Sequence, residues 1–139
     1  MIASRAFIAG ALGGCQAEIG SASAMAAGAL VSLRGGNERQ ISHAAAMALK
    51  NLLGLVCDPV GGLVEVPCVK RNVIGAVNAL AAADMSLAGI ESRISPDQVI
   101  DAMRQVGEQM HPSLKETGEG GLAATPDAKN AFIFVEGLV

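Results

Sequence analysis

The sequence contains no tryptophan or tyrosine and only three phenylalanines among its 139 residues. Because β-sheets favour aromatic and β-branched side chains, this shortage argues against a sheet-rich fold. About half of the residues are hydrophobic, but glycine and alanine dominate the chain. We therefore expect an all-α protein in which helix backbones pack closely through small side chains.

Long apolar runs and blocks of basic charge are also missing. No run approaches the ~20 apolar residues that a membrane-spanning helix needs. The formal net charge is −3, which argues against a surface that binds nucleic-acid phosphates. The N-terminus lacks a convincing signal-peptide core. We expect a soluble cytoplasmic protein, and the odd number of cysteines agrees, since secreted disulfide frameworks normally pair.

Spacing and capping signals place four helices in a single domain over residues 1–139. The expected helices span residues 16–33, 38–53, 68–89 and 96–110. Asn37 can cap the second helix, and Ser95 can cap the fourth, with Gln98 completing a capping box. The expected architecture is all-α, with four or five helices around a core rich in glycine and alanine.

The expected third helix has apolar residues along one side, at Val69, Val73, Val77 and Leu80. Residues 122–139 form a tail whose structure the sequence does not indicate.

The segment between the second and third helices, residues 54–67, differs from the rest of the chain. Two prolines and a Gly-Gly pair interrupt any regular element, yet the segment is rich in valine and leucine. This composition predicts a loop that is buried or half-buried. Because a buried loop needs partners for its backbone groups, we expect the functional site here.

Three cysteines stand near this loop and the first helix. Cys15 follows two glycines at the helix start, and Cys57 and Cys68 flank the loop. Helix N-termini lower thiol pKa values, and thiolates bind metals. The spacing, however, contains no CxxC pair and matches neither a zinc ribbon nor a ferredoxin. By itself it favours inert core cysteines, which behave as small hydrophobes.

Longer motifs surround these cysteines. They are GCQAEIGSASAMAAGAL at residues 14–30, NLLGLVCDPVGGLVEVPCVKRN at residues 51–72 and ETGEGGLAATP at residues 116–126. Together they resemble the alpha chain, or alpha domain, of the iron–sulfur-dependent L-serine dehydratases (L-serine ammonia-lyases). The resemblance implies a [4Fe–4S] cluster held by Cys15, Cys57 and Cys68, and it reverses the interpretation from spacing alone.

The resemblance also implies a reaction. Three cysteines leave one of four irons open, and an open iron can act as a Lewis acid. L-serine would bind there through its carboxylate and β-hydroxyl while a base removes the α-proton. The implied products are aminoacrylate and then pyruvate and ammonia, in amino-acid degradation and gluconeogenesis.

The resemblance implies partners as well. A beta chain or beta domain of the same enzyme is expected, in a homo- or hetero-oligomer. The region that precedes the first cysteine motif in a full alpha chain is not part of this sequence. We therefore expect the chain to correspond to the C-terminal part of an alpha chain.

Arg71 and Asn72 directly follow the last cysteine and are candidate substrate-binding residues. A guanidinium fork at Arg71 suits the substrate carboxylate, whereas the alternative is a solvated or helix-capping cation. Glu18 lies one helical turn after Cys15, so it is either a partner of the site or a surface carboxylate. Asp58, before a proline, is interpreted as a turn residue.

No general base can be assigned from the sequence, because His43 and His111 are both interpreted as structural residues. Two other functions stay open. One is a non-catalytic helical docking domain whose cysteines pack in the core. The other is a lyase that acts on L-threonine, because one methyl group discriminates only modestly between substrates.

Overall fold

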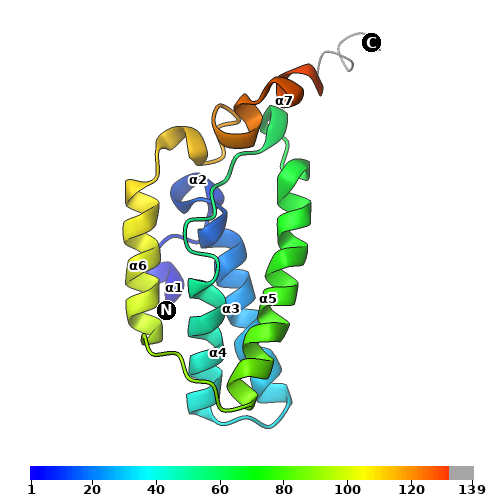
Figure 1. Ribbon diagram of the computed structural model, residues 1–139. Helices are drawn as coiled ribbons and strands as arrows, with labels where there is room; N and C mark the ends of the chain where they lie inside the picture. Colours follow the sequence, from blue (N-terminus) through cyan, green and yellow to red (C-terminus); the bar gives the residue numbers. More distant parts are fainter. Residues whose placement is uncertain (132–139) are drawn as a thin grey trace.

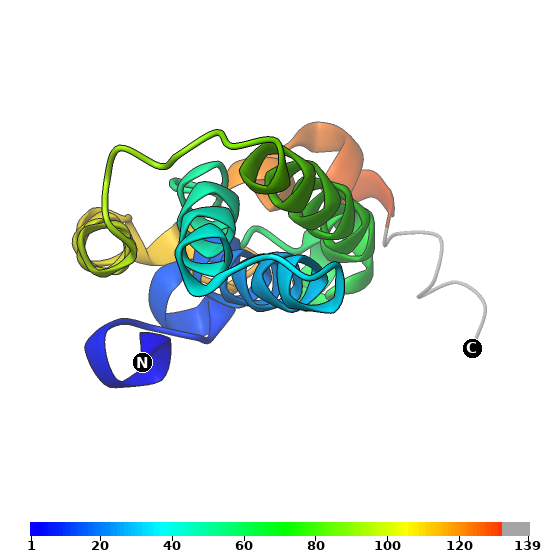
Figure 2. The ribbon, with the colours of Figure 1, turned by 90° about the horizontal axis from the view of Figure 1, so that it is seen from below.

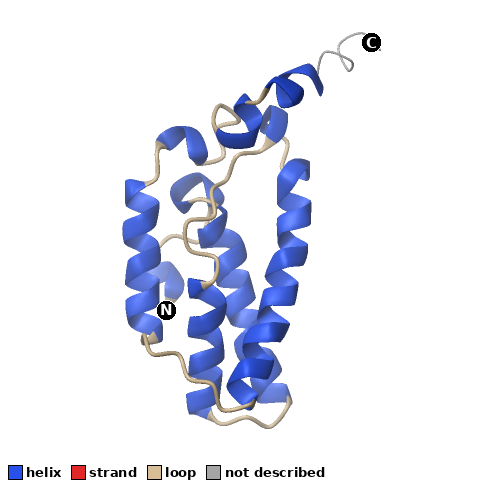
Figure 3. Cartoon of the chain, viewed as in Figure 1, coloured by secondary structure: helices blue, strands red, loops and turns tan. Residues whose placement is uncertain are grey.

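The computed structural model describes residues 1–131, and within that range the chain folds into α-helices joined by turns and longer loops (Figures 1 and 3). Four helices are long: α3 (Cys15–Leu33), α4 (Glu38–Lys50), α5 (Lys70–Leu87) and α6 (Pro96–Gln109). Three are short: α1 (Ile2–Arg5), α2 (Gly10–Gly13) and α7 (Pro126–Ala131). The all-α expectation is confirmed, and the long helices are those expected from the sequence.

Single helical turns occupy parts of the connections. Turns of 3₁₀-helix lie at Val60–Gly62, Pro112–Leu114 and Gly121–Ala124, and a π-helical turn at Glu65–Val69 leads directly into α5. The described residues contain no strand, and their one isolated β-bridge joins Cys57 to Lys115. The sequence did not predict α1, α2 or α7, because short helices have too few turns to show a periodic pattern. Of the tail whose structure was left open, residues 132–139 lie outside the described range.

Helices α3, α4 and α5 pack against one another, and α6 lies beside α4 (Figure 2). Small side chains dominate the buried contacts between them. One core cluster contains Ala27, Val31, Ala44, Met47, Ala48, Ala79, Ala82 and Ala83. A second, which includes α6, contains Ala24, Ala46, Leu49, Val99, Ile100 and Met103. Small residues therefore let the helix backbones approach closely, as the composition predicts.

Capping groups fix where the helices begin. The Asn37 side chain accepts a hydrogen bond from the Gln40 N–H, and the Gln40 side chain accepts one from the Asn37 N–H, each at 3.0 Å. This reciprocal pair is a complete capping box for α4. At α6, Ser95 Oγ accepts from the Gln98 N–H at 3.4 Å. Within residues 1–131, no hydrogen bond joins the Ser95 N–H to the Gln98 side chain. The predicted capping box is therefore only half formed.

Two sequence expectations need correction. The helix predicted over residues 38–53 ends at Lys50, and residues 51–54 turn instead, with Gly54 at a φ of 85°. The loop predicted to be buried is buried at Cys57, Asp58 and Pro59, but residues 61–66 are exposed. The buried and exposed parts of this loop therefore have different environments, which its uniformly apolar composition does not reveal.

None of the helices within residues 1–131 has both the length and the apolar character that crossing a bilayer requires.

Glycines inside helices test how tightly the bundle is packed. A Cβ atom on Gly75 of α5 would lie 2.6 Å from Ile19 Cγ2 of α3, whereas a Cβ on Gly28 would meet its nearest neighbour, Ile41 Cγ2, at 3.4 Å. Alanine improves helix propensity at both positions by about 1 kcal/mol. We expect Gly28→Ala to be neutral or stabilising, and Gly75→Ala to lower the free energy of unfolding by about 1–2 kcal/mol through overpacking. Urea denaturation of the matched pair measures both, and equal effects would contradict the close α3–α5 contact.

Candidate metal centre

Cys15 is the first residue of α3, and its neighbours fix that helix end against the loop. The preceding Gly14 has a φ of 78°, and a side chain there would collide with Met110 and with the backbone of Leu55. The Gln16 N–H donates to Leu55 O at 2.8 Å, which draws the loop across the start of the helix. Glycine is therefore required immediately before Cys15 by both its backbone angle and the close approach of the loop.

Gln16 is a buried polar residue whose role sequence reasoning missed. Its Oε1 accepts from the Gly54 N–H at 3.0 Å, and its Nε2 donates to Met103 O at 3.1 Å. The side chain therefore links the loop to α6 directly beside Cys15. The only sign of its role in the sequence is that Gln16 lies within the first motif. Its spacing from other residues does not indicate that its side chain is buried.

Cys57 is held by its own backbone. Its N–H donates to Leu114 O at 2.8 Å, and its carbonyl accepts from the Glu116 N–H at 2.7 Å. Because of these two bonds, the segment that begins the third sequence motif lies alongside Cys57. The third motif, residues 116–126, therefore begins directly beside the cysteine site. This position gives a structural reason for the resemblance of that motif to a family signature.

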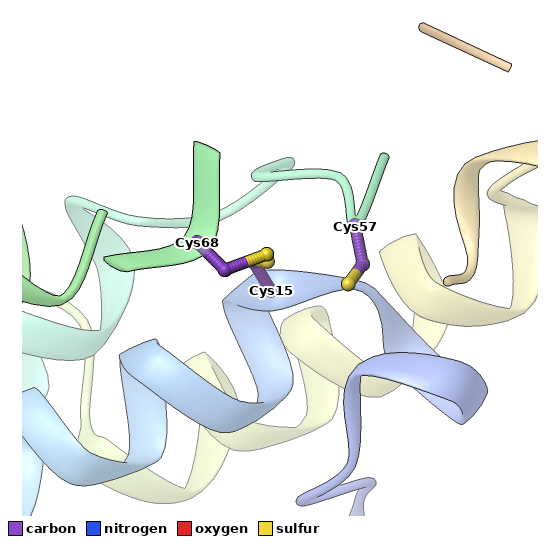
Figure 4. A group of neighbouring side chains, drawn as sticks. All are labelled: Cys15, Cys57 and Cys68. Atoms are coloured by element: carbon purple, nitrogen blue, oxygen red, sulfur yellow. The ribbon is translucent and has the colours of Figure 1, made fainter. Parts of the chain in front are cut away.

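Cys68 lies in the π-helical turn that leads into α5, and it completes a compact group of thiols (Figure 4). The three Sγ atoms all lie within 4.8 Å of one another. All three cysteines are buried, and none forms a disulfide. Segments separated by 41 and 10 intervening residues are thus brought together at the end of the bundle where α3 and α5 begin.

Arg71 and Asp58 form a buried ion pair beside these thiols. Arg71 Nη1 donates to Asp58 Oδ1 at 2.6 Å and to Val56 O at 2.8 Å, and it lies 4.0 Å from Cys15 Sγ. The other carboxylate oxygen of Asp58 accepts from the Leu122 N–H at 2.8 Å. The pair therefore joins the start of α5, the cysteine loop and the third motif. Asp58, interpreted from the sequence as a turn residue, also lies at the site.

The thiols influence one another's protonation. Burial raises the pKa of the Cys57 thiol above its ordinary range, and the neighbouring Cys15, Cys68 and Glu116 raise it further. Burial and Cys15 likewise raise the pKa of Cys68, while Cys57 and Arg71 act in the opposite direction. Adjacent buried thiolates therefore need a cation, and a coordinating metal removes the thiol proton outright.

This donor set fits a soft metal centre. Thiolate ligands select zinc, copper(I) or iron–sulfur clusters. Among residues 1–131, the three cysteines are the one group of at least three histidine, cysteine or acidic side chains that converges in this way. Closed structural zinc sites use four ligands, so three thiolates leave a coordination position for another molecule.

Two carboxylates lie near Cys57. A Cβ atom on Gly10 would lie 3.1 Å from Cys57 Sγ and 3.4 Å from a carboxylate oxygen of each of Glu18 and Glu116. Glu18 was a sequence candidate, and the structure places it at the rim of the site with an exposed side chain. Glu116 was missed. Its φ of 66° is unusual for a residue other than glycine, and only the tertiary structure reveals it.

The remaining sequence candidates lie elsewhere. Asn72 lines a shallow groove between α3 and α5. His43 accepts a hydrogen bond from the Ser92 N–H, and His111 accepts one from the Ser113 N–H at the start of a 3₁₀ turn. His43 thus joins α4 to the connection between α5 and α6, and His111 caps the turn that follows α6.

The ion pair predicts a stability effect. We expect Arg71→Met to lower the free energy of unfolding by about 3 kcal/mol, because it leaves the Asp58 carboxylate buried without its cation. Lys70→Met, which removes an exposed neighbouring cation, should change it by no more than about 0.5 kcal/mol. Adding Asp58→Asn to Arg71→Met should recover part of the loss. Urea denaturation measures all three variants, and equal effects of Arg71→Met and Lys70→Met would contradict the proposed coupling.

Comparisons with known proteins agree with this geometry. The family model described as "Serine dehydratase alpha chain" matches residues 1–123. The "Probable L-serine dehydratase, alpha chain" of Latilactobacillus sakei is 66% identical over 126 residues, which are 91% of this chain and 60% of that protein. The protein of the same name from Bacillus subtilis (strain 168) is 63% identical over 129 residues, 93% of this chain and 43% of its own length.

A longer relative extends the comparison. The "L-serine dehydratase" of Mycobacterium tuberculosis is 52% identical over 120 residues, 86% of this chain and 26% of that protein. The chain therefore spans less than two thirds of the length of these curated relatives. With a family model that covers most of its residues and with its cysteines gathered at one site, the chain belongs to the serine dehydratase alpha-chain family.

Proposed function

We propose that this chain is the cluster-binding part of an L-serine dehydratase, which converts L-serine into pyruvate and ammonia. The observation that carries the proposal is the convergence of three buried thiols within 4.8 Å, in a chain of the serine dehydratase alpha-chain family. Cys15, Cys57 and Cys68 would hold a [4Fe–4S] cluster. A cluster bound by three thiolates supplies a Lewis-acidic iron with a free coordination position.

The residues of the chain itself prepare that site. Arg71 brings a positive charge to within 4.0 Å of Cys15 Sγ, and the same charge counteracts the burial that raises the pKa of the Cys68 thiol. Its contacts with Asp58 and Val56 O hold the cysteine loop in place. These Nη1 contacts support a positioning role for Arg71. Its pairing with the substrate carboxylate, and the binding of substrate by Asn72, stay predictions.

The reaction requires groups that withdraw the α-proton of L-serine and that surround the substrate. Elimination breaks the Cα–H and Cβ–O bonds and releases water, and hydrolysis of the resulting aminoacrylate yields ammonia and pyruvate. We propose that the general base lies on the remaining part of the enzyme, either in the alpha chain or in a partner beta chain. A cytoplasmic location suits this function, because reduced thiols persist there.

Iron content tests the cluster. After anaerobic reconstitution we expect about four iron and about four sulfide ions per chain, and Cys57→Ser should remove most of both. Ala17→Ser is the matched control: Ala17 is as buried as Cys57 and belongs to the first turn of α3, but its side chain bears no sulfur. This control should lose stability while retaining iron.

The result separates the cluster from the alternative of a docking domain with core cysteines. In that alternative, replacing Cys57 changes only the unfolding transition, and the reconstituted wild-type chain stays free of iron. An iron-free wild-type chain would therefore sink the proposed function.

Turnover is tested separately. The reconstituted chain, joined to the remaining part of the alpha chain and co-expressed with the beta chain, should form pyruvate from L-serine, and Cys68→Ser should abolish this activity. L-threonine carries one additional methyl group, so we expect it to react about tenfold more slowly. A coupled assay with lactate dehydrogenase measures pyruvate, and a 2-oxobutyrate assay measures the threonine product. A faster reaction with L-threonine would reassign the substrate.

A further inference from the structure

Two neighbouring helices expose long uncharged surfaces. On α3 no charged residue occurs between Glu18 and Arg34, and on α5 none occurs between Arg71 and Asp84. A helix that lacks charge on every side is normally buried. Here, however, the outer sides of both helices face away from the bundle core (Figure 2).

The exposed side chains on these helices are large and apolar. On α5, Val73 is 62% exposed, Val77 is 60% exposed and Ile74 is 56% exposed. Leu80 and, on α3, Met25 are exposed as well. The apolar stripe that the sequence placed on the third helix therefore lies outside the core of the described residues. Contiguous apolar surface of this kind marks an interaction site.

A groove separates the two helices. It has a volume of about 190 Å³ and is lined by Ile19, Ala22, Ser23, Ala26, Asn72, Gly75 and Ala76. The small residues that line it allow another backbone to approach closely, and Val73, Val77 and Leu80 are exposed on the adjoining side of α5. We name the surface formed by Ala22, Ala26, Val73, Val77 and Leu80 the α3–α5 face.

The occupant can be inferred from the length of the relatives. The matched region is 60% of the Latilactobacillus sakei alpha chain and 43% of the Bacillus subtilis alpha chain. Each of these chains therefore contains many residues that must pack against something. We propose that an apolar helix from that additional part of the alpha chain docks on the α3–α5 face.

The α3–α5 face adjoins the cysteine site. α3 begins at Cys15, and α5 begins two residues after Cys68, so both helices of the face start at the thiol group. A helix lying along them therefore runs past the cysteine site. Its contact side must be free of charge, because an Asp or Lys placed there would lose water without gaining a partner. The inference rests on the alpha-chain assignment and is independent of iron.

A chimera tests the proposal. This chain replaces the matched 126 residues of the Latilactobacillus sakei alpha chain, without any beta chain or reconstituted cluster. Val73→Asp is introduced into the chimera and into the isolated chain, because Val73 is 62% exposed and lies one turn before the groove residue Ala76. The control is Ile90→Asp, because Ile90 is 51% exposed and lies beyond the end of α5. Thermal unfolding is followed by circular dichroism.

We expect Val73→Asp to lower the Tm of the chimera by about 5 °C or more, because the docked helix buries the new carboxylate. In the isolated chain the Tm should change by less than about 2 °C, and Ile90→Asp should have similarly small effects in both proteins.

A chimera that tolerates Val73→Asp would overturn the proposal, and two further measurements would identify what covers the face instead. Sedimentation would then show whether the face binds a second copy of this chain, and added beta chain would show whether it binds that partner. A chimera that fails to fold would also count against the proposal, because the two parts would not be complementary. Iron content is not measured here, so failure of this inference is distinct from failure of the proposed function.

Discussion

The buried ion pair between Arg71 and Asp58 connects the three parts of the chain that form the site. Arg71 lies near the N-terminus of α5, and Asp58 belongs to the cysteine loop. The Leu122 N–H that donates to Asp58 belongs to the third motif. The pair adds to the backbone hydrogen bonds of Cys57 and Gln16 that hold the loop against both neighbours. A buried carboxylate with a matching guanidinium and a backbone donor is satisfied on both oxygens, which makes this arrangement tolerable in the protein interior.

The packing of the bundle also positions the cysteines at this end of the molecule. Alanine and glycine between α3, α4 and α5 bring the helix axes close together, so that the starts of α3 and α5 lie near enough for Cys15 and Cys68 to meet. The loop then adds Cys57, held by backbone bonds to residues 114 and 116. The start of α3 and the turn that leads into α5 therefore supply two of the thiols, and the loop between α4 and α5 supplies the third.

The site and the α3–α5 face are neighbouring features with opposite chemistry. At the helix starts, charge gathers around the thiols through Arg71, Asp58, Glu18 and Glu116. Along the outer sides of the same helices, charge is absent and aliphatic side chains are exposed. This contrast supports both proposals: a metal at the polar end, and further structure packed on the apolar side.

The sequence by itself determined the all-α class, the positions of the four long helices and the cap at Asn37. These features depend on local spacing and on the nearest turn of the chain, which a single sequence shows directly. The motifs also identified the three cysteines and the family. Local patterns did not reveal which side of α5 is exposed, because a stripe of valines looks the same whether it faces a core or an interface.

Only the tertiary structure decided the contacts of the site. The pairing of Arg71 with Asp58, the burial of Gln16 and the approach of Glu116 to Cys57 all join residues that lie on different elements. Such contacts depend on the relative placement of helices and loops, which periodicity and capping signals do not encode. The cysteines illustrate the difference: their spacing alone suggested core residues, whereas the fold brings their sulfur atoms within 4.8 Å of one another.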